Sequence, residues 1–426
     1  MTAQDRVFAK CAWRLIPFMG LLYLINYIDR TNVGFAALTM NADLDLSPAV
    51  FGFGAGIFYV GYALCQVPAN LILERIGARR WVFCILVTWG LLSASNAFVE
   101  TPAGFYAVRF FLGVAEAGFF PGMLLYLTYW FPRSQLPRFT SNFMIAIPVS
   151  FVIGGPLATS ILELDGVAGL RGWQWVFLIE GVPASLLAFA ALKLLPDGPQ
   201  AATWLTDEEK KTIAARLVAE EPRGDSNLWS ALIDPRVIIL GLANLTYQVA
   251  GLGAGLWMPQ IVQAMGFSNR ATGFVTALIF VAGAGAMFLC GRSSTSRGER
   301  IWHAAIPLLF AALGFAAATI EFSYLYVLVA LAFGATGLFA ALGPLFSLPS
   351  SFLRGTAAAG GIGVFNTLGN LGAFLGPTLV GVLTQGSGDY GAGLMFVAVA
   401  FVLSALIILA AGRMIAARPL ITKQAA

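Results

Sequence analysis

Residues 15–38 form an apolar stretch, LIPFMGLLYLINYIDRTNVGFAAL, that is long enough to cross a bilayer as one helix. The chain is 58% hydrophobic and 11% charged, whereas soluble domains are about 45–50% apolar and about 25% charged. A soluble fold cannot hide so much apolar surface, so the sequence predicts an all-α membrane protein of twelve transmembrane helices. The other predicted segments are roughly 50–73, 81–99, 103–128, 138–162, 173–195, 236–262, 270–291, 303–320, 324–347, 356–384 and 390–414.

The segments divide into two halves that repeat each other at an offset of 221 residues. A polar stretch lies between the halves and predicts a short amphipathic helix that starts at the capping box of Thr206 and Glu209. We therefore expect two pseudo-symmetric six-helix bundles, 1–195 and 236–426, joined by a cytoplasmic linker over 196–235. The repeated residues are Gly77, Arg79 and Trp81 with Gly298, Arg300 and Trp302, and Gly155 and Pro156 with Gly376 and Pro377.

Positive charge is concentrated on one set of loops. Of the 25 lysines and arginines, Arg30 and Arg109 fall inside spans and Arg171 and Arg270 on one set of loops, which leaves 21 on the other set and at the termini. The richer set is cytoplasmic by the positive-inside rule. We therefore expect both termini in the cytoplasm and the chain in a plasma membrane of the bacterial inner-membrane type. Charge divided among alternating loops does not suit nucleic acid.

Charged residues also lie inside the predicted spans of the first half. Each costs ~2.5–3.5 kcal/mol at the centre of a membrane helix, so such residues usually mark an ion or substrate path. Arg109 and Glu116 are about two turns apart and share one helix face, whereas Asp29 and Arg30 point about 100° apart. We expect Asp29 to pair with Arg109, which leaves Arg30 as a cation for a carboxylate. Glu180 is expected to be structural.

Several motifs resemble one known family, the major facilitator superfamily, and within it the anion:cation symporter group. NLILERIGARRW between the second and third spans is similar to the loop signature of the superfamily. YIDRTNVGFA, RFFLGVAEAGFFPG, GWQWVFLIEGVP and FNTLGNLGAFLGP are similar to motifs of the group, and together the matches cover nearly the whole chain. The group includes permeases for tartrate, phthalate, 4-hydroxyphenylacetate and sugar acids.

The resemblance implies a role for particular residues. Arg30 would bind the substrate, Asp29 and Glu116 would couple protons, and Arg109 would be their partner. The second copy of the loop signature has Thr295 and Ser296 in place of its acid and arginine, so a latch in the second half is in doubt. The remaining implied residues are Tyr27, Tyr62 and Asn366 for substrate contact, and Glu74, Arg75, Arg79 and Arg80 for a cytoplasmic gate.

These observations favour a secondary transporter that imports a small organic carboxylate by proton symport with alternating access. The four cysteines form no CxxC pair and there is one histidine, so we expect no metal, no cofactor and no enzyme. Sodium stays open as the coupling ion, and we expect a monomer in the lipid bilayer. Two alternatives also stay open: a proton-coupled antiporter that exports a drug-like compound, and a membrane receptor that binds the anion without moving it.

The loop charges make a direct prediction for topology. With the native cysteines replaced by serine, Arg79→Cys and Arg300→Cys should react with an impermeant thiol reagent only from the cytoplasmic side. Arg171→Cys, on the opposite set of loops, should react only from outside. Labelling of Arg79→Cys or Arg300→Cys from outside would contradict the predicted orientation.

Overall fold

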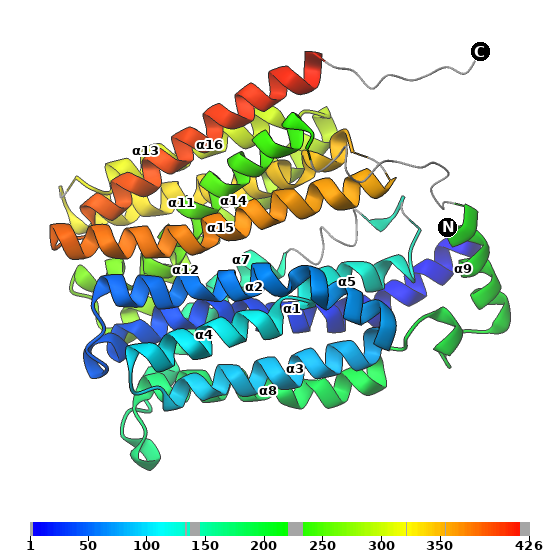
Figure 1. Cartoon of the computed structure of the whole chain (residues 1–426). Helices are drawn as coiled ribbons and strands as arrows, with labels where there is room; N and C mark the ends of the chain where they lie inside the picture. The colour runs from blue at the N-terminus through cyan, green and yellow to red at the C-terminus, as the bar shows by residue number, and fades with distance from the viewer. Residues whose placement is uncertain are drawn as a thin grey trace. The chain divides into compact units, whose positions relative to one another are not determined.

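The computed structural model describes residues 3–132, 134–136, 145–219, 233–320, 322–353 and 355–417, and these residues contain no strand. The first half holds α1 (Ala3–Asp43), α2 (Pro48–Ile76), α3 (Ala78–Ser95), α4 (Pro102–Glu116), α5 (Phe119–Thr128), α7 (Ala146–Leu162), α8 (Gly172–Leu194) and α9 (Asp207–Ala219) (Figure 1). The second half holds α11 (Pro235–Ala264), α12 (Asn269–Arg297), α13 (Ile301–Ala317), α14 (Tyr324–Ser347), α15 (Gly355–Ser387) and α16 (Gly391–Ala417).

The helices coincide with the twelve predicted segments. In the described part of the chain, 10 stretches are long and apolar enough to cross a membrane, and the shorter apolar helices α7 and α13 match two further segments. The predicted span 103–128 is divided between α4 and α5. The start of the predicted span 138–162 lies outside the described residues.

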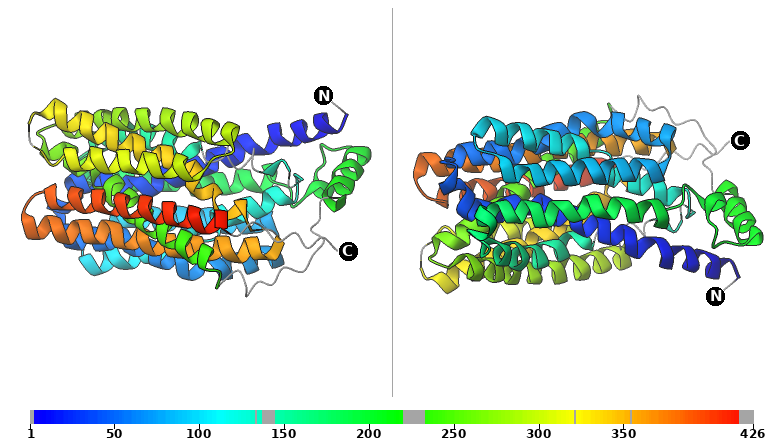
Figure 2. Two further views of the ribbon diagram at one scale, coloured as in Figure 1. Left: turned by 90° about the horizontal axis from the view of Figure 1, so that it is seen from above. Right: turned by 90° about the horizontal axis from the view of Figure 1, so that it is seen from below.

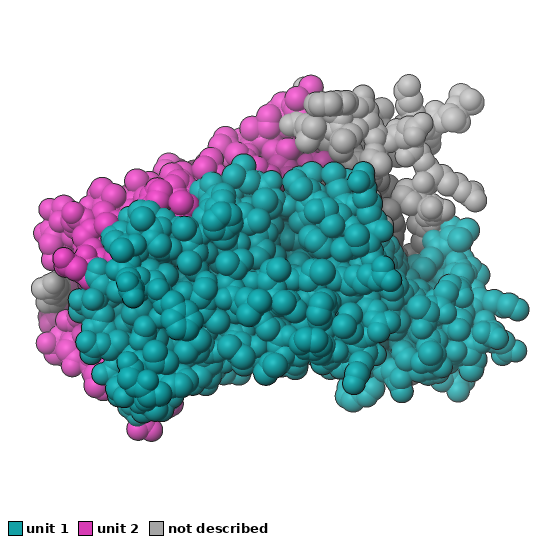
Figure 3. Space-filling view, turned by 60° about the horizontal axis from the view of Figure 1, so that its bottom comes forward, with its two compact units in different colours: residues 1–44, 60–223 teal, residues 45–59, 224–426 magenta. Residues whose placement is uncertain are grey.

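The chain forms two compact units, which Figure 3 colours separately. Unit 1 comprises residues 1–44 and 60–223, and unit 2 comprises residues 45–59 and 224–426. The first half of α2 therefore groups with unit 2 and its second half with unit 1. The predicted division at 1–195, 196–235 and 236–426 stays a prediction.

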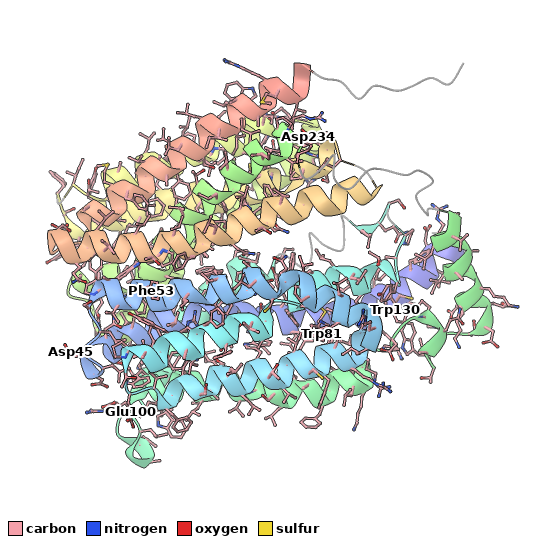
Figure 4. All side chains as sticks on the ribbon, in the orientation of Figure 1. Asp45, Phe53, Trp81, Glu100, Trp130 and Asp234 are labelled. Atoms are coloured by element: carbon pink, nitrogen blue, oxygen red, sulfur yellow. The ribbon has the colours of Figure 1, made fainter. Side chains whose placement is uncertain are left out.

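In unit 1, α1 packs against α7 and α8, and α3 packs against α4 and α8. Small residues allow this close approach: a Cβ atom on Gly181 of α8 would lie 2.8 Å from the backbone nitrogen of Ala94 in α3. Figure 4 shows Trp81 and Trp130 toward one end of the unit and Glu100 at the other, as helices of alternating direction require.

The predicted linker helix is present and is bound to α1. The backbone nitrogen of Thr206 donates to Glu209 at 2.8 Å and that of Glu209 donates to Thr206 at 3.3 Å, so the capping box is confirmed. Lys10 near the start of α1 donates to both carboxylate oxygens of Glu209, at 2.9 and 2.8 Å. This hydrogen bond from Lys10 lowers the pKa of Glu209. Figures 1 and 2 show α9 at the same end as the N-terminus.

Aromatic residues complete the contact between the linker and unit 1. The Trp204 ring stacks on Trp130 with centroids 5.6 Å apart, and the Arg14 guanidinium lies 5.2 Å from the Trp204 ring. Ile213 of α9 is fully buried. The beginning of the linker is therefore an integral part of unit 1, a docking that the sequence did not predict.

In unit 2, α11 packs against α15 and α16, and α14 packs against α12 and α13. The repeat is visible in the turns: Gly77 between α2 and α3 has φ +84° and Gly298 between α12 and α13 has φ +64°, a region that favours glycine. A Cβ atom on Gly372 of α15 would overlap the carbonyl oxygen of Leu245 in α11. The two helices thus approach at backbone distance.

This crossing predicts a position-specific loss of stability. Gly372→Ala should lower the free energy of unfolding by about 1–3 kcal/mol, because a backbone carbonyl group has to move. Gly363→Ala is the matched control on the same helix, where a new Cβ meets nothing within 4 Å. There alanine should have no effect or a gain of up to about 1 kcal/mol. Equal melting temperatures for the two purified variants would contradict the close crossing.

Candidate functional site

The centre of the candidate site is an ion pair between Arg30 of α1 and Glu116 of α4. Arg30 Nε donates to Glu116 Oε2 at 2.8 Å, and the two side chains are 12% and 0% exposed. Asn26 Nδ2, one turn earlier on α1, donates to the same oxygen at 2.7 Å. The other oxygen, Oε1, is buried and has no hydrogen-bond partner among the described residues. One carboxylate oxygen of Glu116 therefore carries both contacts to α1.

Two tyrosine rings flank the guanidinium group of Arg30. Its Cζ atom lies 5.5 Å from the ring centroid of Tyr27 and 4.8 Å from that of Tyr62, distances typical of cation–π contacts. Tyr27 in turn packs edge-on against Tyr23, with centroids 5.0 Å apart. The structure thus brings together Arg30, Glu116, Tyr27 and Tyr62, all named from the sequence. Their roles stay predictions.

Asp29 points to a different neighbour. Its carboxylate accepts hydrogen bonds from Trp89 Nε1 at 2.7 Å, from Asn32 Nδ2 at 3.2 Å and from the hydroxyl group of Ser93. Trp89 and Ser93 belong to α3 and lie one turn apart. Asp29 is 1% exposed, so neutral donors solvate its carboxylate in place of water.

The predicted charge pairing needs correction. The prediction that Arg30 has no carboxylate partner in the protein is wrong, because it pairs with Glu116. Arg109 is buried and acts on Asp29 through its charge, while the hydrogen bonds to Asp29 come from neutral side chains. The physical reason is the rotation along α1: Asp29 is directed to α3, and Arg30, about 100° further round, is directed to α4.

The helix that carries Glu116 is interrupted directly after it. α4 ends at Glu116 and α5 begins at Phe119. Pro121 has no backbone N–H group, and its ring excludes a helical hydrogen bond to the carbonyl of Ala117, four residues earlier. The nitrogen of Ala117 itself bonds to the oxygen of Val114 at 3.4 Å. Irregular backbone within a span is tolerated where protein or a polar cavity surrounds it, so this break is consistent with a functional position.

The remaining predicted residues are placed as follows. Asn366 lies half-buried on α15, which belongs to unit 2. Arg75, Arg79 and Arg80 are exposed where α2 meets α3, and the side chain of Glu74 lies outside the described part of the chain. The backbone nitrogen of Arg79 donates to Asp197 of the linker at 3.0 Å. The gate role of these residues stays a prediction.

Three polar residues of the site were not predicted from the sequence, namely Asn32, Trp89 and Ser93. Asn32 lies three residues after Asp29 on the same face of α1, and this helical spacing could have indicated it. Trp89 and Ser93 lie in an apolar span that holds no buried charge, so the sequence gives no signal for them.

Comparison with known proteins identifies the family. A model of the Major Facilitator Superfamily matches residues 19–377. The chain belongs to this superfamily. A putative tartrate transporter of Agrobacterium vitis is 44% identical over 413 residues, which are 96% of this chain and 95% of that protein. A quinolone resistance transporter of Acinetobacter baumannii is 38% identical and covers 94% of this chain and 93% of its own length.

A solved structure supports the fold. The crystal structure of a bacterial homologue of the human lysosomal transporter Spinster has a TM-score of 0.77, with 18% identity over 95% of this chain and 97% of that one. The predicted fold class, twelve membrane helices in two six-helix bundles, is confirmed. The chain is a membrane transport protein of the major facilitator superfamily and not an enzyme, as the sequence predicted.

Proposed function

We propose that this major facilitator protein imports a small organic carboxylate by proton symport with alternating access. The observation that carries the proposal is the buried Arg30–Glu116 pair, in which the guanidinium group is bordered by two tyrosine rings. A guanidinium fork binds carboxylates through two parallel hydrogen bonds. Arg30 is therefore suited to exchange the carboxylate of Glu116 for that of a substrate.

Coupling follows from this exchange. A substrate carboxylate that binds Arg30 displaces Glu116, which then lies in an apolar interior without its cation. An isolated ionised carboxylate is far too costly to bury, so Glu116 takes up a proton instead. Substrate and proton thus enter together, and the two bundles can then change their orientation with no added charge. After both are released to the cytoplasm, the Arg30–Glu116 pair forms again and stabilises the empty carrier.

Further features of the proposal rest on the sequence. The distribution of lysine and arginine supports an inner membrane location with both termini in the cytoplasm. We propose that residues 1–195 and 236–426 rock about the site in a monomer, with Tyr27, Tyr62 and Asn366 in contact with substrate and Asp29 and Arg109 assisting coupling. L-tartrate is the first substrate to test, because the relative from Agrobacterium vitis carries that name.

Export of a drug-like compound is a second candidate, favoured by the name of the relative from Acinetobacter baumannii. Two features weigh against it. Exporters that use proton antiport resemble one another in a Gly-Pro-x-x-Gly-Gly run, and here Gly155-Pro156 is followed by Thr159-Ser160 at the last two positions. Arg30 also suits an anion better than a lipophilic cation. Uptake of labelled carboxylate and of labelled quinolone into proteoliposomes, under both directions of proton gradient, separates the two.

A substitution at Arg30 tests the substrate site. A charge-assisted hydrogen bond to a buried carboxylate is worth roughly 1.5–3 kcal/mol, so Arg30→Ala should weaken binding by about 10- to 150-fold. Arg30→Lys should weaken binding less than Arg30→Ala, because the ammonium group keeps the positive charge. It should still bind more weakly than wild type, because an ammonium group cannot reproduce the guanidinium fork. Thermal-shift screening against aromatic, sugar-derived and dicarboxylic acids, tartrate included, first selects the carboxylate, and calorimetry then gives the Kd. Arg171→Lys, whose side chain is 62% exposed, is the control. Binding by Arg30→Ala within twofold of wild type would refute the assignment.

A substitution at Glu116 tests coupling. Glu116→Gln mimics the protonated acid, so the variant should bind substrate and perform counterflow exchange but fail to accumulate substrate under a proton gradient. The control is Glu100→Gln, an acid-to-amide change at an exposed loop position. Full proton-driven accumulation by Glu116→Gln in proteoliposomes would move the coupling role to Asp29 or to a sodium ion. Dependence of uptake on a sodium gradient distinguishes these.

A further inference from the structure

The interior of unit 1 holds more acids than cations. Asp29, Glu116 and Glu180 are 1%, 0% and 5% exposed, and the guanidinium groups that face them are those of the buried Arg109 and of Arg30, whose side chain is 12% exposed. Glu116 forms an ion pair with Arg30, and Arg109 acts on Asp29 through its charge. Glu180 is thus the surplus acid among the described residues of this interior.

Glu180 lies on α8, which packs against α1, α3 and α7. Both of its carboxylate oxygens are buried, and neither has a hydrogen-bond partner among the described residues. From α1, Asp29 and Asn32 face it closely enough to act on its charge. α7 contains no ionisable residue, and the ionisable residues of α3, which are Arg79, Arg80 and Cys84, are exposed. Among the described residues of these helices, no cation compensates a negative charge on Glu180.

Arg109 offsets the charge of Asp29, but two ionised carboxylates close together in an apolar interior need a second positive charge. The missing positive charge is supplied either by a proton or by a metal cation such as sodium. A metal cation needs free oxygen ligands, but Trp89, Ser93 and Asn32 already donate to the oxygens of Asp29. Donor groups directed at that carboxylate suit an ionised Asp29 and leave the proton for Glu180.

We propose that Glu180 is a second proton-binding site of this protein, occupied in the substrate-free state and kept occupied through the cycle. The protonated acid of Glu180 faces Asn32 and Asp29 across the contact between α1 and α8, so the interior of unit 1 carries no net charge. Sequence reasoning assigned Glu180 a structural role, and the charge balance gives it a chemical one.

The proposal rests on proton symport at Glu116 and deepens it. With a proton resident on Glu180, the empty carrier is electrically balanced before any substrate binds. Each carboxylate that binds Arg30 then brings in one proton, for Glu116, and the proton of Glu180 is not transported. The two acids thus have separate tasks, and separate measurements report on them.

Infrared spectroscopy of the purified full-length protein, without substrate, tests the assignment. A protonated buried carboxyl group gives a C=O stretching band that shifts in deuterium oxide. At neutral pH we expect this band in wild type, in Glu100→Gln and in Glu116→Gln, and its loss in Glu180→Gln. Absence of the band from wild type, or its persistence unchanged in Glu180→Gln, would overturn the proposal. So would loss of the wild-type band when sodium replaces potassium, because sodium would then occupy the site.

Two further measurements guard against trivial outcomes. Wild-type protein made with isotopically labelled glutamate should show a shifted band. This measurement tests the assignment even where Glu180→Gln folds poorly. A band that does not shift overturns the assignment to a glutamate. In proteoliposomes, Glu180→Gln should retain proton-driven accumulation, and loss of accumulation would show that its proton is transported rather than resident. Because the spectra contain no substrate, a missing band refutes Glu180 alone, whereas failure of proton-driven uptake by wild type refutes symport and leaves the band in place.

Discussion

A bilayer provides no water to an ionised side chain, and the interior of unit 1 is built around that constraint. The Arg30–Glu116 pair satisfies it for two charges, and the three donors around Asp29 satisfy it for another. The Arg30–Glu116 pair is not strong in isolation, because the cost of removing both charges from water offsets much of their electrostatic attraction. In the proposed mechanism, a competing carboxylate can therefore replace Glu116 at Arg30. The proposed binding of a substrate carboxylate depends on this property, because a permanently satisfied arginine could not release its carboxylate.

The position of Glu116 adds a second requirement. It is the last residue of α4, and Asn26 donates to the oxygen that Arg30 also contacts. An uninterrupted helix would hold the carboxylate rigidly relative to the turn that follows. The break before α5 removes part of the backbone hydrogen bonding at this point, so the proposed release of Glu116 from Arg30 would need little rearrangement of α4. The backbone break thus lies at the residue for which charge exchange is proposed.

Much of the architecture could be predicted because the bilayer reduces it to a few strong rules. Span length and apolar content located the twelve helices, and turn glycines such as Gly77 and Gly298 marked the repeat. The buried charges were found in the first half because apolar context makes them conspicuous. Their partners were not found: pairing depends on helix rotation and on which helix lies adjacent, and neither is encoded by spacing along one helix. Neutral donors such as Trp89 and Ser93 gave no signal at all.

The bond between Lys10 and Glu209 joins residues 199 positions apart in the chain. During synthesis Lys10 emerges among the first residues, whereas Glu209 emerges only after the helices from α1 to α8 have been made. The bond between Lys10 and Glu209 can therefore form only after those helices have been synthesised. A chain truncated anywhere before residue 209 would leave Lys10, near the start of α1, without the carboxylate that binds it. The linker thus completes the first half of the protein in time as well as in space.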